Sequence, residues 1–246
     1  MNTYIAEVAG KDSVAAILKF GRENPGSEIL PTVVFTSTEY GDKSIYRNSI
    51  LFLQNELQKH DVVVHDEILL QNSELWNVLN ARYQYLIYQK YCFFTPCIMC
   101  HLYTHLLRIP VYKKYGANGL ITGERKSHSG IVKLNQHIKT IHLFQEMFCK
   151  LGIYLIQPLL EIEDTKVIDE IIANKNIITH ANDVKCVLSG NTFGFSLVQK
   201  ENLLLLEDYM KEFVSTVGEF CIQRINRNGE IPLTELDNWI RRQLNE

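Results

Sequence analysis

Short apolar runs alternate with helix-spaced apolar positions along the first two thirds of the chain. The run over residues 3–8 predicts a buried strand, and a glycine-containing turn follows it. Val14, Ile17 and Leu18 then fall at spacings of three and four, which predicts a helix with one apolar face. Further apolar runs predict strands at residues 32–35, 62–64, 119–122 and 154–156. This alternation indicates an α/β protein with a doubly wound parallel sheet and right-handed crossovers.

The helical pattern is strongest between these strands and after the last of them. Apolar positions spaced by three and four residues predict a helix from Tyr46 to Leu57. An aromatic-rich segment predicts a single helix over residues 73–92. Other helices are expected from Thr95 to about Tyr115, around residues 167–172, and from Leu203 to the end with one break at Asn228-Gly229.

Strand signals cease near residue 190, and this change divides the chain. We predict a nucleotide-binding α/β domain over residues 1–190 and a helical C-terminal element over residues 191–246. The C-terminal element would be a dimerisation element, a substrate-binding element or a closing helical layer. A homodimer is therefore one expected assembly.

Composition narrows the class of protein. The chain has 246 residues and 46% hydrophobic content, which suffices for one sizeable core. Its net charge of −3 argues against a generally basic surface for nucleic acid. No apolar run approaches the roughly 18 residues of a membrane span, and the N-terminus lacks the pattern of a secretion signal. We therefore expect a cytoplasmic protein with no membrane partner, whose six cysteines are reduced.

The turn after the first strand carries residues that suit a phosphate group. A strand, a glycine turn and a helix N-terminus place free backbone N–H groups and a positive dipole end at one point. Ala9 and Gly10 are small enough for a phosphate to approach the backbone, and Lys11 adds a positive charge. Ser13 can donate a hydroxyl hydrogen bond, and Asp12 can cap the helix. This turn is the first candidate ligand site.

The segment Gly10-Lys11-Asp12-Ser13 resembles the PP-loop of the ATP-pyrophosphatase superfamily, whose usual form is Ser-Gly-Gly-x-Asp-Ser. The resemblance covers the predicted α/β domain and implies a HUP-like fold that binds ATP, with Mg2+ bridging the phosphate oxygens. It implies that Ala9, Gly10, Lys11, Asp12 and Ser13 hold the nucleotide. It also implies that Lys11 and Asp12 are catalytic.

Two positions depart from the PP-loop pattern. Val8 stands where the family has Ser, so one hydroxyl is missing from the phosphate cradle. Ala9 stands where the family has Gly, and a Cβ disfavours a turn with positive φ. These departures leave open a second hypothesis, in which the chain is a non-catalytic nucleotide-binding regulator on a degenerate PP-loop.

Two later turns resemble other nucleotide-binding parts of the superfamily. The end of the second strand cradles the adenosine in that family, and by position this points to Phe35, Thr36 and Ser37. The turn that contains Gly123, after the fourth strand, resembles a third nucleotide-side element. The alternative for Gly123 is a plain turn glycine.

Cys97 and Cys100 form a Cys-x-x-Cys pair behind Pro96, at the start of a predicted helix. Such a pair fits zinc, an iron–sulfur cluster or a redox disulfide, and a helix N-terminus favours the thiolate. A third cysteine, Cys186, follows the last predicted strand and its closing segment Gln157-Pro158-Leu159. The three thiols together are the second candidate site.

This layout resembles the tRNA 2-thiolation branch of PP-loop enzymes, which have a Pro-Cys-x-x-Cys pair in mid-chain and a third Cys after the Pro-Leu of the last strand. The resemblance implies that Cys97, Cys100 and Cys186 bind a 4Fe-4S cluster with one iron open to sulfide. It implies that ATP adenylates a carbonyl oxygen, which sulfur then replaces. The implied partners are ATP, a sulfur donor, and either tRNA or a small-molecule substrate.

Other assignments of the cysteines remain open. A Cys3His site could bind Zn2+, completed by His101, His105 or His180. The thiols could instead be redox-active, or three unrelated buried groups. Free cysteines commonly behave as small buried hydrophobes, and core positions are predicted on this ground for Cys92, Cys149 and Cys221.

Residues 122–129 also resemble part of the phosphoadenylyl-sulfate reductase branch. Arg125 would then bind a sulfate or nucleotide phosphate through its forked guanidinium. The alternative for Arg125 is a surface ion pair. A third branch, the ATP-dependent amide-forming enzymes, would use the Cys-x-x-Cys pair for structural zinc.

Overall fold

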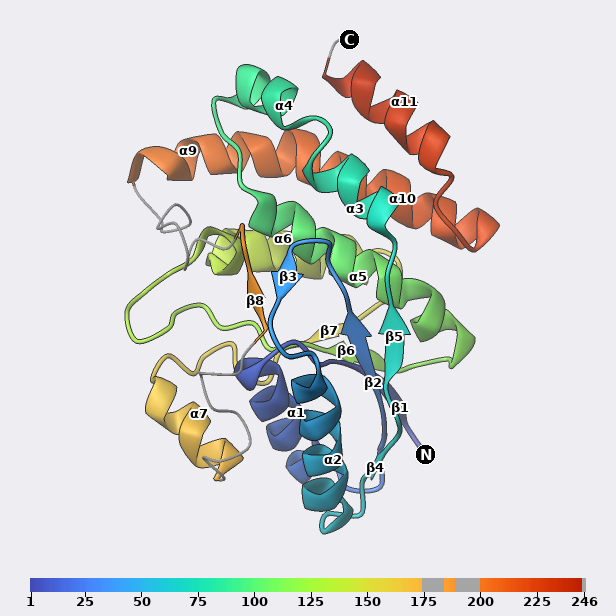
Figure 1. Ribbon diagram of the computed structural model, residues 1–246, viewed down its shortest axis with the longest axis vertical. Helices are drawn as coiled ribbons and strands as arrows, with labels where there is room; N and C mark the ends of the chain where they lie inside the picture. Colours follow the sequence, from blue (N-terminus) through green and yellow to red (C-terminus); the bar gives the residue numbers. More distant parts are fainter. Residues whose placement is uncertain (174–183, 189–199, 245–246) are drawn as a thin grey trace.

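A parallel β-sheet lies between layers of helices (Figure 1). The computed structural model describes residues 1–173, 184–188 and 200–244. One face of the sheet is covered by α1 (Lys11–Glu23), α2 (Ser44–Gln58) and α7 (Thr165–Ile172), which share one hydrophobic core cluster with it. The opposite face is covered by α5 (Pro96–Lys114) and α6 (Ile138–Cys149). The expected α/β architecture is therefore confirmed.

The order of the strands in the sheet is β4-β2-β1-β6-β7, and every pairing in it is parallel. A further strand, β5, also pairs with β2, beyond the end of β4. The strand bounds are β1 (Thr3–Glu7), β2 (Glu28–Val34), β4 (Val63–Val64), β5 (Ile68–Leu70), β6 (Gly119–Ile121) and β7 (Leu155–Ile156). Successive strands run outward from β1 to β2 and β4, and the chain then returns to the other side of β1 with β6. The sheet is therefore doubly wound, as predicted.

Strand β1 is the centre of this arrangement. Ile5 and Ala6 are both fully buried, and they belong to the two core clusters on opposite faces of the sheet. Ala6 pairs with Pro31 of β2 and with Ile121 of β6. A strand that is paired on both edges and covered on both faces reads as a continuous apolar run. This explains why residues 3–8 are recognisable as a strand from the sequence.

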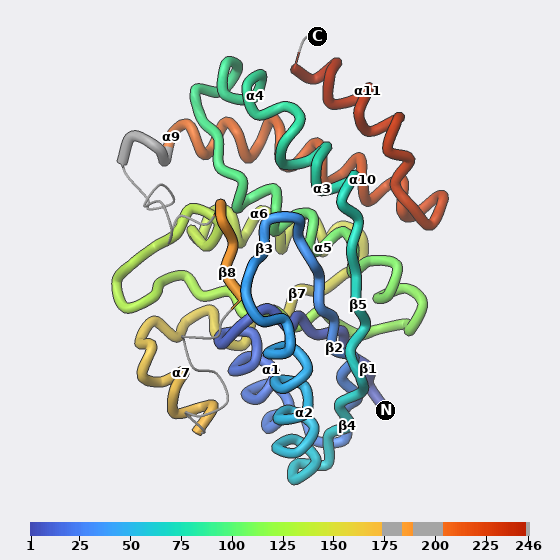
Figure 2. The backbone as a smooth tube through the Cα atoms, in the orientation of Figure 1, coloured from blue at the N-terminus to red at the C-terminus, as the bar shows by residue number. Residues whose placement is uncertain are grey.

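A second group of helices packs on the outer side of α5 and α6 (Figure 2). Helix α10 contacts α5 and α6, and α11 contacts α3. These helices share one large hydrophobic cluster with α5 and α6. The bounds are α3 (Ser73–Asn80), α4 (Gln84–Tyr91), α9 (Lys200–Asp208), the π-helix η2 (Tyr209–Val214), α10 (Ser215–Asn228) and α11 (Leu233–Gln243).

The C-terminal part follows the predicted helical pattern. Helix α10 ends at Asn228, and Gly229 adopts the left-handed conformation with φ 79°, which confirms the predicted break. The predicted domain boundary near residue 190 lies outside the described residues. The division into residues 1–190 and 191–246 stays a prediction.

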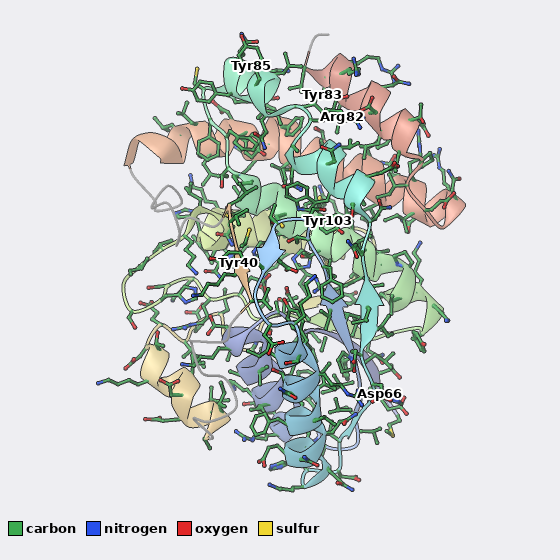
Figure 3. All side chains as sticks on the ribbon, in the orientation of Figure 1. Tyr40, Asp66, Arg82, Tyr83, Tyr85 and Tyr103 are labelled. Carbon is green, nitrogen blue, oxygen red and sulfur yellow. The ribbon has the colours of Figure 1, made fainter. Side chains whose placement is uncertain are left out.

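The single helix predicted over residues 73–92 is wrong, because two helices, α3 and α4, occupy this segment. Arg82 and Tyr83 lie at the break and face α11 (Figure 3). The Tyr83 hydroxyl donates a hydrogen bond to Asp237 Oδ1 over 2.6 Å, and Arg82 Nη1 forms an ion pair with the same carboxylate over 2.5 Å. These contacts with α11 stabilise a break between α3 and α4, and the local aromatic pattern contains no sign of that break.

The pattern did not predict β5 or the 12-residue helix α6, and it also missed three other short elements. Strand β3 (Glu39–Tyr40) pairs antiparallel with β8 (Lys185–Cys186), which places Glu39 opposite Cys186. A 3-10 turn, η1 (Leu134–Gln136), precedes α6. β3, β8 and η1 are each only two or three residues long, so none of the three carries a measurable hydrophobic period.

Helix α5 is 19 residues long and begins at Pro96. Proline is favoured in the first turn because its missing N–H would have no partner there. A membrane-spanning helix needs about 20 predominantly apolar residues, and none of the helices in the described parts of the chain meets the requirements of length and hydropathy together.

A buried polar contact joins α5 to the centre of the sheet. Arg108 is 1% exposed, and its Nε donates to Thr32 Oγ1 over 2.9 Å. Thr32 in turn donates to the carbonyl oxygen of Ala6 over 2.8 Å. Arg108 Nη2 lies 3.5 Å from Glu7 Oε1. A buried guanidinium requires such partners, since an unsatisfied charged donor in the interior is costly.

Replacing Thr32 with Val should destabilise the protein by about 1–3 kcal/mol, because Arg108 Nε would lose its acceptor while it stays buried. Urea unfolding followed by circular dichroism measures this change. Thr216→Val is the matched control: the half-buried Thr216 bonds only carbonyls of its own helical segment. The control should change stability by less than about 0.5 kcal/mol. Equal effects of the two substitutions would show that the contact with Arg108 contributes nothing.

Candidate active site

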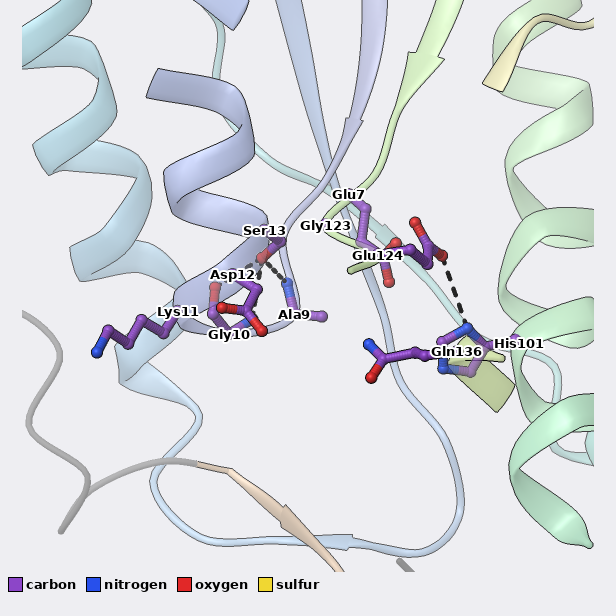
Figure 4. Close-up of a pocket in the computed structure, with 10 residues that line it drawn as sticks. All are labelled: Glu7, Ala9, Gly10, Lys11, Asp12, Ser13, His101, Gly123, Glu124 and Gln136. Carbon is purple, nitrogen blue, oxygen red and sulfur yellow. Dashed lines mark hydrogen bonds and ion pairs between the residues drawn. The ribbon is translucent and has the colours of Figure 1, made fainter. Parts of the chain in front are cut away.

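A cavity of about 270 Å³ opens beyond the carboxyl ends of β1 and β6 (Figure 4). Ligands of doubly wound proteins bind at the point where the strand order reverses, and here that point lies between β1 and β6. Residues from the loop after β1, from the turn after β6 and from α5 form the walls, among them Glu7, Gly10, Asp12, Ser13, His101 and Glu124. The topology therefore identifies this cavity as the candidate active site.

The loop after β1 is organised around the hydroxyl of Ser13. This oxygen accepts hydrogen bonds from the backbone N–H groups of Ala9, over 2.9 Å, and Gly10, over 3.0 Å. It donates to the carbonyl oxygen of Gly10 over 2.7 Å. Two backbone donors thus converge on one oxygen at the N-terminus of α1, a geometry that suits an anionic oxygen.

The residue Ala9 does not obstruct this loop. Gly10 is extended, with φ −180° and ψ −161°, and neither Ala9 nor Gly10 is among the described residues with positive φ. The left-handed turn that a Cβ at Ala9 would oppose is therefore not present. The expected penalty for alanine in place of the family's glycine is wrong for this backbone.

Lys11 and Asp12, both predicted to be catalytic, point in different directions. Lys11 Nζ forms an ion pair with Asp169 of α7, away from the cavity (Figure 4). The Asp12 carboxylate lies 3.3 Å from Arg125 Nη1 and 3.5 Å from His128 Nδ1. Asp12 is therefore placed to act in the cavity, whereas the ammonium group of Lys11 is engaged outside it.

Lys133 is a cation that the sequence reasoning missed. It is half-buried, and its ammonium lies within electrostatic reach of both Asp12 and Cys97. Burial lowers its pKa, and the two negative groups oppose that effect. Lys133 follows no recognisable motif, since it lies in an irregular segment before η1. It links the phosphate loop to the cysteines.

Arg125 is 1% exposed and fully engaged with the protein. Its Nε donates to the carbonyl oxygen of Ile162 over 2.8 Å and its Nη2 to that of Glu163 over 2.5 Å. The surface ion-pair alternative is wrong, because the side chain is buried. The contacts show a structural role for Arg125, joining residues 162–163 to Asp12, and its binding of a phosphate or sulfate stays a prediction.

Gly123 permits the turn after β6 to pack against the N-terminus of α1. A Cβ at this position would lie 2.6 Å from the backbone nitrogen of Ser13 and 2.7 Å from its Cα. Gly123 is absent from the described glycines with positive φ. The alternative of a plain turn glycine is therefore wrong: the residue is required for close approach of two backbones.

Phe35, Thr36 and Ser37 follow β2, one strand away from the loop. The Phe35 ring contacts Tyr46 edge-on with centroids 6.0 Å apart, and Lys43 Nζ lies 4.3 Å from the ring centroid. The described residues that line the 270 Å³ cavity do not include these three. Their contact with adenosine stays a prediction.

The structure brings the three predicted cysteine ligands into one neighbourhood. Cys97 and Cys100 lie in the first turn of α5, and the pairing of β3 with β8 delivers Cys186. Thr38 Oγ1 lies 3.1 Å from Cys186 Sγ. Burial, together with the charges of Cys186 and Cys97, raises the pKa of Cys100 to about 12. A thiolate at Cys100 therefore requires a positive partner.

The three thiols do not form a described group of metal-ligand atoms that all lie within 4.8 Å of one another. Tetrahedral zinc with bonds of about 2.3 Å places its sulfur ligands about 3.8 Å apart. Among the described residues, the group of three ligand atoms that all lie within 4.8 Å of one another is instead His101, His105 and Glu124. His180, a third candidate for a Cys3His site, lies outside the described residues.

The other cysteines divide between core and surface. Cys221 is fully buried, as predicted. The predicted core positions of Cys92 and Cys149 are wrong, because both are exposed. Cys92 caps α4 in a left-handed conformation with φ 52°, and Cys149 is the last residue of α6. Helix ends lie at the surface, and the residue type alone does not show this.

A group of buried titratable residues forms one wall of the cavity. His105 is 1% exposed, and burial lowers its pKa to about 3. Burial alone would raise the pKa of Glu124, but the hydrogen bond from His101 and the nearby His105 lower it to about 2. Burial raises the pKa of Glu7 despite the nearby Arg108. The sequence signal for this group was the spacing of His101 and His105, four residues apart on one helix.

The metal-free protein should lose stability as the pH falls from about 6.5 towards 3. Below about 6.5 the unfolded chain protonates its exposed histidine, while His105 in the folded protein stays neutral until its pKa near 3. The unfolded state then binds more protons, so acid favours it. Urea midpoints at pH 7 and pH 5 test this, with His105→Gln as the comparison. An equal loss of stability in the variant would contradict the assignment.

Gly123→Ala should destabilise the protein by about 2–3 kcal/mol, because the added methyl group meets backbone atoms that cannot rotate away. Gly10→Ala is the matched control within the same site. An added Cβ at Gly10 has no atom within 4 Å, and its extended φ suits any residue. The control should cost less than about 1 kcal/mol. Thermal and urea unfolding of the two variants measure both changes in stability. Equal changes would contradict the role of Gly123 in close packing.

The amino-acid sequence is similar to that of a known protein. The chain is 33% identical over 218 residues to the uncharacterized protein MJ0009 of Methanocaldococcus jannaschii, and the match covers 85% of this chain and 76% of that protein. No family model matches the sequence.

Solved structures extend the comparison to the fold. A 4-thiouridine synthetase in complex with RNA and bound ATP matches 89% of this chain with a TM-score of 0.52 and 16% identity. The chain spans about half of that synthetase, 52% of its length. The U34-tRNA thiolase NcsA from Methanococcus maripaludis, with its 4Fe-4S cluster, gives a TM-score of 0.42 at 13% identity, covering 100% of this chain and 73% of that one.

The chain thus shares its α/β fold with the 4-thiouridine synthetase. The chain belongs to the family of the uncharacterized protein MJ0009.

Proposed function

We propose that the chain is an ATP-dependent sulfurtransferase that adenylates a carbonyl oxygen of a tRNA nucleoside and replaces that oxygen with sulfur. The observation that carries this proposal is the convergence of two sites at one edge of the sheet. The PP-loop at Gly10 lines the cavity, and Cys97 and Cys100 lie in the first turn of the helix that supplies its His101 wall. The Lys133 ammonium is within electrostatic reach of both Asp12 and Cys97. The fold shared with a 4-thiouridine synthetase that binds RNA and ATP supports the same partners.

The loop would bind the pyrophosphate part of ATP. The N–H groups of Ala9 and Gly10 already point at one oxygen, the hydroxyl of Ser13. A phosphate oxygen can take that position while Ser13 rotates to donate to it. Lys133 adds positive charge within electrostatic reach of Asp12, and Mg2+, when bound with ATP, would neutralise the charge of the phosphates.

The reaction then has two balanced steps. The nucleoside carbonyl oxygen attacks the α-phosphorus of ATP, the bond to the bridging oxygen breaks, and pyrophosphate leaves. A hydrosulfide equivalent from a sulfur donor adds to the activated carbon, and AMP leaves with the former carbonyl oxygen. The carbon does not change its oxidation state, so no electron donor is needed when the sulfur arrives as sulfide. Asp12 lies at the cavity wall, where it can orient the metal-bound phosphates.

The cysteines fit a 4Fe-4S cluster better than a single zinc ion. The three thiols come from the α5 N-terminus and β8, and Cys97 and Cys186 both act electrostatically on Cys100. They are not among the described groups of ligand atoms that all lie within 4.8 Å, as a compact zinc site would require. The raised pKa of Cys100 also demands a cationic partner before a thiolate can form there. Cys97, Cys100 and Cys186 would bind such a cluster, which would supply an open iron for sulfide.

The test is an anaerobic reaction with ATP, Mg2+, sulfide and unmodified tRNA, followed by mass spectrometry of the digested nucleosides. Formation of AMP together with a thiolated nucleoside is expected. Cys186→Ser should lose bound iron and reduce thiolation at least about 100-fold, because the cluster would lose one of its three ligands. Cys149→Ser, which changes an exposed cysteine, is the control and should retain full activity.

The variants also separate the two sites. Ser13→Ala should slow formation of AMP while leaving the iron content unchanged, because the hydrogen bonds of the Ser13 hydroxyl are to backbone groups of the phosphate loop. Ser44→Ala, at an exposed helix start, serves as its control. Full thiolation by Cys186→Ser, or an absence of AMP with every tRNA supplied, would refute the proposed function.

A further inference from the structure

Three potential metal ligands meet at the inner wall of the cavity. His101 and His105 lie one turn apart on α5, and Glu124 follows β6. His101 Nδ1 and His105 Nε2 are each 3.6 Å from Glu124 Oε1. One ligand atom from each residue lies within 4.8 Å of the others.

His105 is the residue that most needs a further partner. Its side chain is 1% exposed, and neither ring nitrogen has a hydrogen-bond partner among the residues that the structure describes. The ring is fixed by Phe144 and Phe148, whose centroids lie 5.7 and 5.4 Å away in edge-on contact. A buried imidazole with no hydrogen bond is costly, and a metal ion at Nε2 would satisfy that nitrogen.

The geometry approaches that of a metal site. Ligand bonds of about 2.1 Å in a tetrahedral arrangement separate neighbouring ligand atoms by about 3.4 Å. The two observed separations of 3.6 Å therefore need to shorten only slightly. We propose that His101, His105 and Glu124 bind a divalent transition-metal ion such as Zn2+. This site is distinct from the cysteine site, because none of its ligands is a thiol.

The donor set decides the class of metal. Two imidazoles and one carboxylate suit zinc, cobalt, manganese or ferrous iron, whereas Mg2+ and Ca2+ prefer oxygen ligands throughout. The ion would therefore not be the Mg2+ that accompanies ATP. His101 and Glu124 also line the cavity, so a fourth coordination position would face the loop at Gly10. Such an open position is typical of catalytic metal sites and not of structural ones.

Polar neighbours are in place to orient the ligands. The Asn135 amide lies 2.9 Å from His101 Nε2, and the Gln157 amide lies 3.5 Å from Glu124 Oε2. With its amide turned, Asn135 would accept the Nε2 proton of His101 and leave Nδ1 free for metal, a common arrangement around metal-bound histidines. Glu7 adds a second carboxylate to the cavity wall, which favours a cation there.

The experiment uses Co2+ as the probe, because its absorption spectrum reports the ligands. The full chain carrying Cys97→Ser, Cys100→Ser and Cys186→Ser is stripped with a chelator and titrated with Co2+. We expect one Co2+ per chain, with visible d–d bands and no thiolate charge-transfer band. Binding should also raise the melting temperature, since the ion binds only the folded state.

Two ligand variants and one control complete the test. His101→Asn and Glu124→Gln should each weaken Co2+ binding by at least about 10-fold. His142→Asn, which changes an exposed histidine of α6, should bind Co2+ normally. Circular dichroism of the metal-free variants verifies folding, and the partly exposed His101 is the ligand whose replacement least disturbs the core.

Failure to bind Co2+, or binding that the His101 and Glu124 substitutions leave unchanged, would overturn the proposal. Both results are independent of sulfur transfer, because the titration involves neither ATP nor tRNA. The proposed function could therefore be refuted while the metal site is confirmed, and the metal site could be refuted while the proposed function is confirmed.

Discussion

Strand β1 pairs in parallel with β2 on one side and β6 on the other, and this double pairing positions the phosphate loop and the cavity beside it. Because carboxyl ends of parallel strands meet at the same edge, the loop after β1 and the turn after β6 must face each other. Gly123 sets how closely they approach, since its Cα packs against the backbone of Ser13. The phosphate loop is thus part of the packing of the sheet and its first helix.

Helix α5 supplies most of the potential metal ligands at this edge of the sheet. Its first turn presents Cys97 and Cys100, the next two turns present His101 and His105, and the fourth buries Arg108 against the sheet. The contacts of Arg108 with Thr32 and Glu7 join the helix to β1 and β2. A buried arginine is weak evidence for stability but constrains position. Because Arg108 lies on the same helix as the histidines and thiols, its contacts with the sheet also fix the position of those residues relative to the sheet.

The charged groups of the cavity determine which ligands it can hold. Glu7 and Glu124 place two carboxylates in a wall that faces a loop of backbone donors. Phosphates alone would be repelled by that wall, so cations are needed between them. Lys133 lies within electrostatic reach of Asp12, and His101 and Glu124, two of the three proposed metal ligands, line the cavity. Nucleotide binding and metal binding would therefore support each other electrostatically.

Much of the fold could be predicted from the sequence, because strands buried on both faces are continuous apolar runs. Residues 3–8 and the helix that begins at Lys11 are clear in the pattern, and with them the phosphate loop. The Cys-x-x-Cys pair is equally local, since its spacing fits one helical turn. What the sequence determined was thus the chemistry whose residues are neighbours in the chain.

Only the tertiary structure decided which distant residues share a site. It paired β3 with β8 and so carried Cys186 to the helix start, placed Glu124 against His101 and His105, and turned Lys11 towards Asp169. It also placed Lys133 between the loop and the cysteines. These outcomes depend on contacts between segments far apart along the chain, and local periodicity contains no information about which segments will pack together.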